Sequence, residues 1–210
     1  MVAESGSAGD KETGRVEAFS DGVFAIAITL LVLDLKIPSA SPSARLADQL
    51  AKQWPAYLAF LISFSFIGIM WINHHRLFTY IRRTDHALLI LNGSLLMGVT
   101  VVPFTTALLA AYLGHPGQDV AAMVYSGTYV VIAVFFNLLW HHAATGKRLL
   151  GRSADMAEIA ALTKQYLFGP LLYLVCFGLA RLNVTASLLL NVALAIFFAL
   201  PPKPAAVRER

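Results

Sequence analysis

Long apolar runs alternate with short polar segments along this chain of 210 residues. An α-helix needs about 20 apolar residues to cross the hydrocarbon core of a bilayer, and these runs approach or exceed that length. The polar segments between them contain the prolines, glycines and charges that end helices. The pattern predicts six membrane-spanning helices, at residues 16–36, 54–78, 86–113, 120–144, 165–182 and 184–200.

Composition agrees with this pattern. Hydrophobic residues make up 58% of the chain and charged residues only 13%, whereas about 25% of the residues of a soluble protein are charged. We therefore predict an all-α polytopic membrane protein. Its six-helix transmembrane domain is expected at 15–200, between a polar tail at 1–14 and a basic tail at 201–210. The fourth connection is expected to be a basic loop at 146–164.

The basic residues indicate how the chain lies in the membrane. With six spans, 12 of the 16 Lys and Arg residues fall on the side that holds both termini. Because basic residues accumulate on the cytoplasmic side, both termini are expected to be cytoplasmic and the protein to be a multi-pass protein of the cell membrane. Topology thus accounts for the net charge of +4. The basic residues form no patch with interleaved aromatic residues, so no nucleic-acid partner is expected.

The first span carries the most informative pattern, RVEAFSDGVFAIAITLLVLD at 15–34. Ile26, Leu30 and Leu33 have the spacing i, i+4, i+7, which places them within about 60° on a helical wheel. Asp21 lies about 140° from Ile26 on the same wheel. Charges inside a transmembrane helix are costly, so Asp21 is a candidate functional residue.

The second span ends in the polar run WINHHRLF at 71–78, which returns to the cytoplasmic side. Asp21 and this run are both expected roughly 6–8 Å below the cytoplasmic boundary. We therefore expect Asp21 to bond one or more of four side chains, Asn73, His74, His75 and Arg76. Two simpler interpretations remain open. Ser20 or Asp21 could cap a helix that begins after them, or the His-His-Arg cluster could be an interfacial anchor.

Two histidine pairs, His74/His75 and His141/His142, could in principle hold haem or a metal. Neighbouring residues on a helix point about 100° apart, so neither pair can chelate an ion alone. The sequence contains no C-x-x-C-H, G-x-S-x-G or H-E-x-x-H motif. We therefore predict neither an enzyme nor a protein with a resident metal or cofactor.

The residues of the first three spans resemble those of a known family. Arg15, Phe19, Ser20 and Asp21 form an R-x-x-x-F-S-D motif that continues into GVFAIAITLLVL. With WINHHRLF, Asp85 and the run LLILN downstream, this pattern is similar to the transmembrane protein 175 family of potassium channels. The resemblance implies a six-helix subunit whose first helix lines a central ion pathway.

The resemblance also implies roles for individual residues. Ile26, Leu30 and Leu33 correspond to an apolar constriction, and Thr29 to the polar layer beside it. Arg15, Ser20 and Asp21 correspond to a hydrogen-bonded network with the end of the second helix, and Phe19 belongs to the same motif.

The motif occurs once in this chain, as in the single-repeat prokaryotic members, which implies a homotetramer that conducts potassium ions across the lipid bilayer. The T-V-G-Y-G filter of ordinary potassium channels is absent. An apolar constriction should penalise sodium more, because sodium holds its water more tightly, so a modest preference for potassium is expected. The alternatives are a proton-coupled transporter or proton-permeable channel that uses Asp21 and a histidine, and a non-conducting scaffold.

Overall fold

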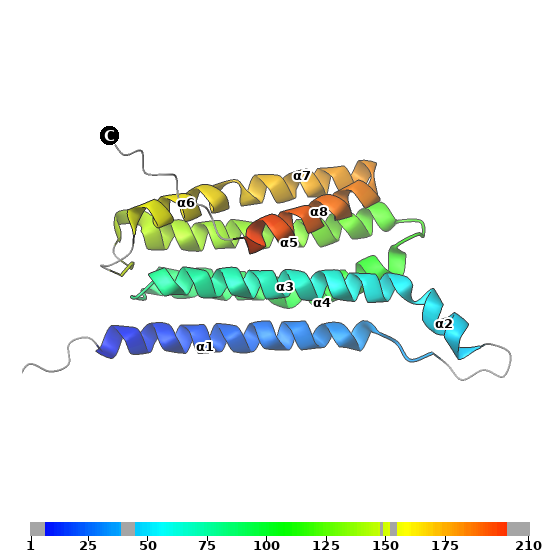
Figure 1. The fold of residues 1–210 in the computed structure, drawn as a ribbon, viewed down its shortest axis with the longest axis horizontal. Helices are drawn as coiled ribbons and strands as arrows, with labels where there is room; N and C mark the ends of the chain where they lie inside the picture. The colour runs from blue at the N-terminus through cyan, green and yellow to red at the C-terminus, as the bar shows by residue number, and fades with distance from the viewer. Residues whose placement is uncertain (1–6, 39–44, 148, 152–154, 201–210) are drawn as a thin grey trace, which may run out of the picture.

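The computed structural model describes residues 7–38, 45–147, 149–151 and 155–200, and they are almost entirely helical. The basic tail at 201–210 and the first residues of the polar tail lie outside this part of the chain. In Figure 1, α1 runs along one side, α3 and α4 form the middle, and α5 to α8 form the other side. The helices are α1 (Ser7–Leu30), η1 (Leu31–Asp34), α2 (Leu46–Lys52), α3 (Trp54–Tyr80), α4 (His86–Tyr112), α5 (Gln118–Ala144), η2 (Thr145–Lys147), α6 (Met156–Leu167), α7 (Gly169–Leu182) and α8 (Val184–Ala199).

The predicted all-α membrane fold is confirmed. Five helical stretches of the described chain are long and apolar enough to cross a bilayer, and Val184–Ala199 is a shorter apolar helix. The fifth stretch, Met156–Leu182, joins α6 and α7. Asn183 separates α7 from α8 and caps α8, because its side chain accepts a hydrogen bond from the Ala186 amide.

The expected loop at 146–164 is partly wrong, because α6 occupies its second half. Asp155 caps this helix by accepting a hydrogen bond of 2.8 Å from the Ala157 amide. Ile159, Leu162 and Tyr166 follow at helical spacing and are buried. Lys164 was expected in a loop, but it and Glu158 lie on the exposed face of this amphipathic helix.

The first helix also differs from the prediction at both ends. It begins at Ser7, inside the segment expected to be a polar tail, and its α-helical part ends at Leu30. A 3₁₀ turn, Leu31–Asp34, continues it. Side chains three residues apart eclipse one another in a 3₁₀ helix, so Leu33 lies in line with Leu30.

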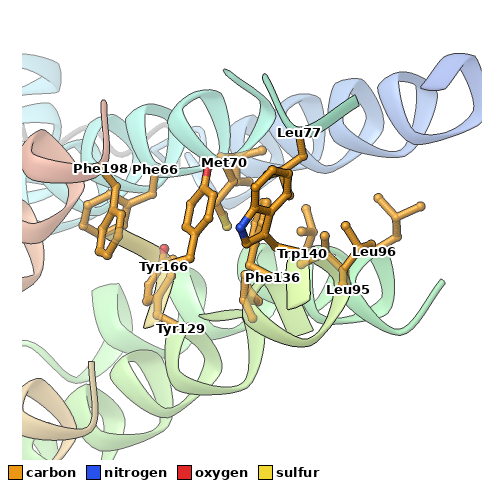
Figure 2. Close-up of a cluster of buried hydrophobic side chains, with 14 of the residues drawn as sticks. Phe66, Met70, Leu77, Leu95, Leu96, Tyr129, Phe136, Trp140, Tyr166 and Phe198 are labelled. Atoms are coloured by element: carbon orange, nitrogen blue, oxygen red, sulfur yellow. The ribbon is translucent and has the colours of Figure 1, made fainter. Parts of the chain in front are cut away.

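Aromatic side chains join α3 to the helices on its far side. Figure 2 shows Phe66 and Met70 of α3 beside Tyr129 of α5, Tyr166 of α6 and Phe198 of α8. The rings of Phe66 and Tyr129 meet edge to face, with their centroids 4.9 Å apart. Edge-to-face packing is a favoured geometry for aromatic pairs, and the rings thus bind the two halves of the bundle.

Two connections on the cytoplasmic side of the predicted topology are joined by their backbones. Ile81, after α3, forms an isolated antiparallel bridge with Leu150, after α5. The Arg82 amide donates to the Leu149 carbonyl at 2.8 Å, and the Gly151 amide donates to the Tyr80 carbonyl at 2.9 Å. These bonds fix the ends of α3 and α5 relative to each other.

Candidate ion-conduction site

Helix α1 has one face packed against the subunit and one face without cover. Ser20, Phe24, Ala27 and Leu31 are buried, with spacings of four, three and four residues. This is the spacing of a single helical face, and the face packs against α3 and α4. Figure 1 shows α1 at the edge of the bundle, and among the described residues its opposite face is exposed.

The uncovered face consists largely of apolar side chains. Phe19 is 66% exposed, Ile26 60%, Leu30 42% and Leu33 73%. Ile26 and Leu30 are four residues apart in the α-helix, and the 3₁₀ turn keeps Leu33 on the same line. The structure thus arranges the three predicted constriction residues as one column on the outside of the subunit.

Thr29 lies on the same exposed side of α1. Its hydroxyl donates a hydrogen bond of 2.9 Å to the Ile26 carbonyl, three residues earlier. A hydroxyl has one donor and two acceptor lone pairs, so this bond fixes the proton and leaves the oxygen able to accept. Thr29 can therefore offer an oxygen beside the apolar column.

A buried hydrogen-bonded chain lies behind this face and connects three helices. Ser20 of α1, Asn92 of α4 and His74 of α3 are each at most 3% exposed. The Asn92 amide nitrogen donates to Ser20 Oγ at 3.0 Å, and His74 Nε2 lies 2.9 Å from Asn92 Oδ1. Ser20 Oγ donates in turn to the Val16 carbonyl at 2.7 Å.

The donor and the acceptor of each hydrogen bond in this series can be assigned. The Ser20 hydroxyl donates its only proton to the Val16 carbonyl, so its oxygen must accept from the Asn92 amide nitrogen. The remaining Asn92 oxygen can only accept, so His74 Nε2 must carry a proton. Each side chain thus has a partner, which is the condition for burying polar groups. The chain locks the rotation of α1 against α3 and α4, and so sets which face α1 turns outward.

The capping interpretation of Ser20 and Asp21 is wrong, because both lie well inside α1. The interpretation of the His-His-Arg cluster as an interfacial anchor fails for His74, which is 1% exposed and packed between the rings of Phe24 and Phe78. The sequence pointed to His74 but gave no role to Asn92. Asn92 ends the LLILN run of the family resemblance, and that run is the signal that points to it.

Asp21 bonds a residue that the sequence analysis did not select. Trp71 Nε1 donates to Asp21 Oδ1 at 2.8 Å, across the gap between α3 and α1. The Trp71 ring stacks on His75, with centroids 6.1 Å apart. Both Asp21 and Trp71 are exposed in the single subunit. The carboxylate therefore tethers the outer edge of α1 to the polar end of α3.

The prediction that Asn73 and Arg76 could meet Asp21 is wrong. Asn73 points away from α1, and its amide nitrogen donates to the Phe198 carbonyl at 3.0 Å. Its oxygen accepts from Tyr166 Oη at 3.0 Å and from an Arg76 nitrogen at 3.4 Å. Asn73 and Arg76 are three residues apart and share one face of α3, whereas Trp71 and His74 share another. Because α3 has neighbours on both sides, the two faces contact different helices.

We expect Asp21→Ala to destabilise the packing of α1 on α3 in each subunit, and so to weaken assembly of the oligomer. The substitution removes the acceptor of Trp71 Nε1, whereas Asp21→Asn keeps an amide oxygen there and should be milder. A double-mutant cycle with Trp71→Phe, read by thermal unfolding, should give a coupling above about 0.5 kcal/mol, the level of independent sites. A cycle between Asp21 and His74 is the control and should give less coupling, since His74 bonds Asn92 instead. Equal coupling in both cycles would contradict the assignment.

Arg15 and Phe19 border an open pocket at the start of α4, together with His86 and Leu89. Asp85 caps α4 through the Leu88 amide and also meets His142 Nε2 at 3.0 Å.

Within residues 7–38, 45–147, 149–151 and 155–200, no three His, Cys, Asp or Glu side chains gather in a way that could hold a metal ion.

Comparison with known proteins identifies the family. The family model for "endosomal/lysosomal potassium channel TMEM175" matches residues 15–103. A potassium channel of Chamaesiphon minutus is 58% identical over 191 residues, which are 90% of this chain and 94% of that protein. This chain belongs to the TMEM175 family. The matched segment contains the uncovered face of α1 and the hydrogen-bonded side chains behind it, those of Ser20, His74 and Asn92.

A solved structure supports the assignment. The crystal structure of a lysosomal potassium-selective channel TMEM175 homolog from Chamaesiphon minutus has a TM-score of 0.82 and 54% identity, and the match covers 90% of this chain and 97% of that one. The human endosomal/lysosomal proton channel TMEM175 is 34% identical over 135 residues, which are 60% of this chain and 27% of that larger protein.

Proposed function

We propose that this TMEM175 protein is a potassium channel of the cell membrane, built from four copies of the chain around a central axis. Helix α1 lines the axis, Ile26, Leu30 and Leu33 form the constriction, and Thr29 supplies the polar layer beside it. The permeant ion is K⁺, and the channel needs no resident cofactor and catalyses no reaction. The relatives named as potassium channels support this proposal.

The uncovered apolar column of α1 is the observation that carries the proposal. A single helix face cannot enclose a pathway, so symmetry-related copies must complete it. Behind this face, Ser20, Asn92 and His74 are hydrogen-bonded to one another, which holds its direction. Four columns facing one axis would form a narrow apolar ring. Such a ring offers no ligands to replace water, so the ion that holds its water less tightly passes more easily.

Single-channel recording of the purified protein in planar bilayers tests the function. We expect unitary currents in symmetric potassium, and a reversal potential under a sodium/potassium gradient that shows a modest preference for potassium. A carrier or a scaffold would give no unitary steps. Mass measurement of the detergent-solubilised particle tests the stoichiometry, and a particle smaller than four subunits would overturn the tetramer.

Proton permeation is a second candidate, favoured by the human relative that is named a proton channel. The carboxylate of Asp21 lies on the exposed side of α1 near His75 and could serve as a proton-binding group. Currents recorded under a pH gradient, with a large impermeant organic cation in place of potassium, separate the two functions. Proton current should then persist in wild type and fall in Asp21→Asn.

Both termini are expected on the cytoplasmic side. Reporter fusions at Arg210 and between α5 and α6 should read cytoplasmic, and a fusion between α4 and α5 should read external. The last fusion is the matched control, since it lies in a short connection between two long spans. A cytoplasmic reading at all three positions would contradict the arrangement.

A further inference from the structure

We infer that each subunit contains a binding site for a small apolar molecule, in a cavity of about 50 Å³ between α3 and the helices α5 to α8. The cavity is separate from the uncovered face of α1, which lies on the other side of α3. A water molecule needs roughly 10–15 Å³ on this measure, so the space exceeds that of a single water. It suits a xenon atom or part of one small ring.

The walls are made of aromatic rings from five helices, α3 and α5 to α8. Tyr129 stacks on Tyr173 at 5.8 Å, Tyr173 on Phe198 at 6.0 Å, and Phe198 on Tyr166 at 6.5 Å. Phe66 lines the space from the side of α3, and Figure 2 shows its ring beside Phe198. Ring faces and a thioether, that of Met70, are polarisable surfaces that gain dispersion energy from a guest.

Water is a poor occupant of this cavity because the polar groups of Asn73, Tyr129 and Tyr166 at its wall already have partners. Both ends of the Asn73 amide are bonded, to Phe198 and Tyr166 among others. The Tyr129 hydroxyl donates to Tyr125 Oη at 3.2 Å. A water needs two to four polar partners, so a cavity with a mainly apolar wall favours apolar guests over water.

Two small residues create the space. Gly169, at the start of α7, and Ala133 of α5 both line the cavity. A methyl group added at Gly169 would lie 3.4 Å from the Phe198 ring and 3.9 Å from the Ala133 side chain, which is ordinary contact. Gly169→Ala can therefore shrink the cavity without displacing its neighbours, and Ala133→Leu can fill it further.

Occupancy has a mechanical consequence. The guest would contact α3 on one side and α5 to α8 on the other, so it would stabilise the packing between the two halves seen here. A ligand that binds only the folded state raises stability by mass action. It would do so from a position remote from the proposed ion pathway, and the inference therefore stands or falls independently of potassium conduction.

Xenon is the probe for the test. Crystals of the full-length protein are pressurised with xenon, and anomalous scattering locates the atom. We expect a peak between the rings of Tyr129 and Phe198 in wild type, and its loss in the double variant Gly169→Ala, Ala133→Leu. The control is Val131→Leu, on the same helix as Ala133 but 49% exposed in the isolated subunit, which should keep the peak. The absence of a wild-type peak there would overturn the inference.

Thermal unfolding in solution provides the second measurement. The unfolding temperature of wild type should rise with xenon pressure, whereas that of Gly169→Ala should rise less. Gly169→Ala alone serves if the double variant does not fold. Xenon peaks confined to the lipid-facing surface, or an equal temperature shift in wild type and Gly169→Ala, would show that the cavity takes no apolar guest.

Discussion

Replacing Ile26 by asparagine is expected to raise the unitary potassium conductance and to lower the preference for potassium over sodium. Ile26 is 60% exposed on the uncovered face of α1, in line with Leu30. In four copies, the amide groups would hydrate the narrowest part of the proposed pathway. Ions would then pass with more of their water, and the difference in dehydration energy between the two ions would count for less. Bilayer recordings of conductance and reversal potential measure both changes.

The matched control is Leu189→Asn on α8. Leu189 is 66% exposed, so it is as accessible in the isolated subunit as Ile26, but it lies on a helix at the opposite side of the bundle. We expect its conductance and selectivity to equal those of wild type. Identical behaviour of the two variants would show that Ile26 does not face the pathway.

The second large effect is expected for Asn92→Leu, which should destabilise every subunit. Leucine has a similar volume but leaves the proton on His74 Nε2 and the acceptor on Ser20 without their partner. A buried polar group without a partner costs about 1–3 kcal/mol. The rotation of α1 would lose its lock at the same time, so we expect fewer intact oligomers and a lower unfolding temperature.

Thr100→Val, on the same helix, is the control for Asn92→Leu. Thr100 is exposed and its hydroxyl bonds only its own helix, at the Met97 carbonyl. Its loss should change the free energy of unfolding by less than about 0.5 kcal/mol. The double variant His74→Phe, Asn92→Leu should recover part of the stability, because removing both partners leaves one unpaired group fewer. Failure to recover would argue against a specific bond between the two.

The sequence was sufficient to predict the elements whose periodicity is long and unbroken. The apolar column of α1 follows from the spacing of Ile26, Leu30 and Leu33, and a 3₁₀ turn could not disturb it, because that turn keeps residues three apart in line. Helix α6 was missed, since its Lys and Glu residues resemble those of a loop when its buried neighbours are unknown.

Pairing between helices could not be predicted in the same way. A polar residue near the end of α3 can turn toward α1 or toward α6 and α8, and a rotation of about 100° decides between them. Trp71 and His74 face α1 and α4, whereas Asn73 faces Tyr166. The position of a residue along its helix can be counted from the sequence, and this position gives its depth in the membrane. The direction of its side chain around the helix depends on which helices pack there.

The residues after α3 that form the backbone bridge with the connection after α5 have two separate roles, one for their amides and one for their side chains. The amides of Arg82 and Arg83 both donate to the Leu149 carbonyl, while their side chains count toward the charge that orients the chain. A hydrogen bond donated by a backbone N–H group does not depend on which side chain the residue carries, except that proline has no N–H group. Mutation can therefore redistribute charge over this surface during evolution, and retune insertion or lipid contact, without moving the helices that the bridge holds.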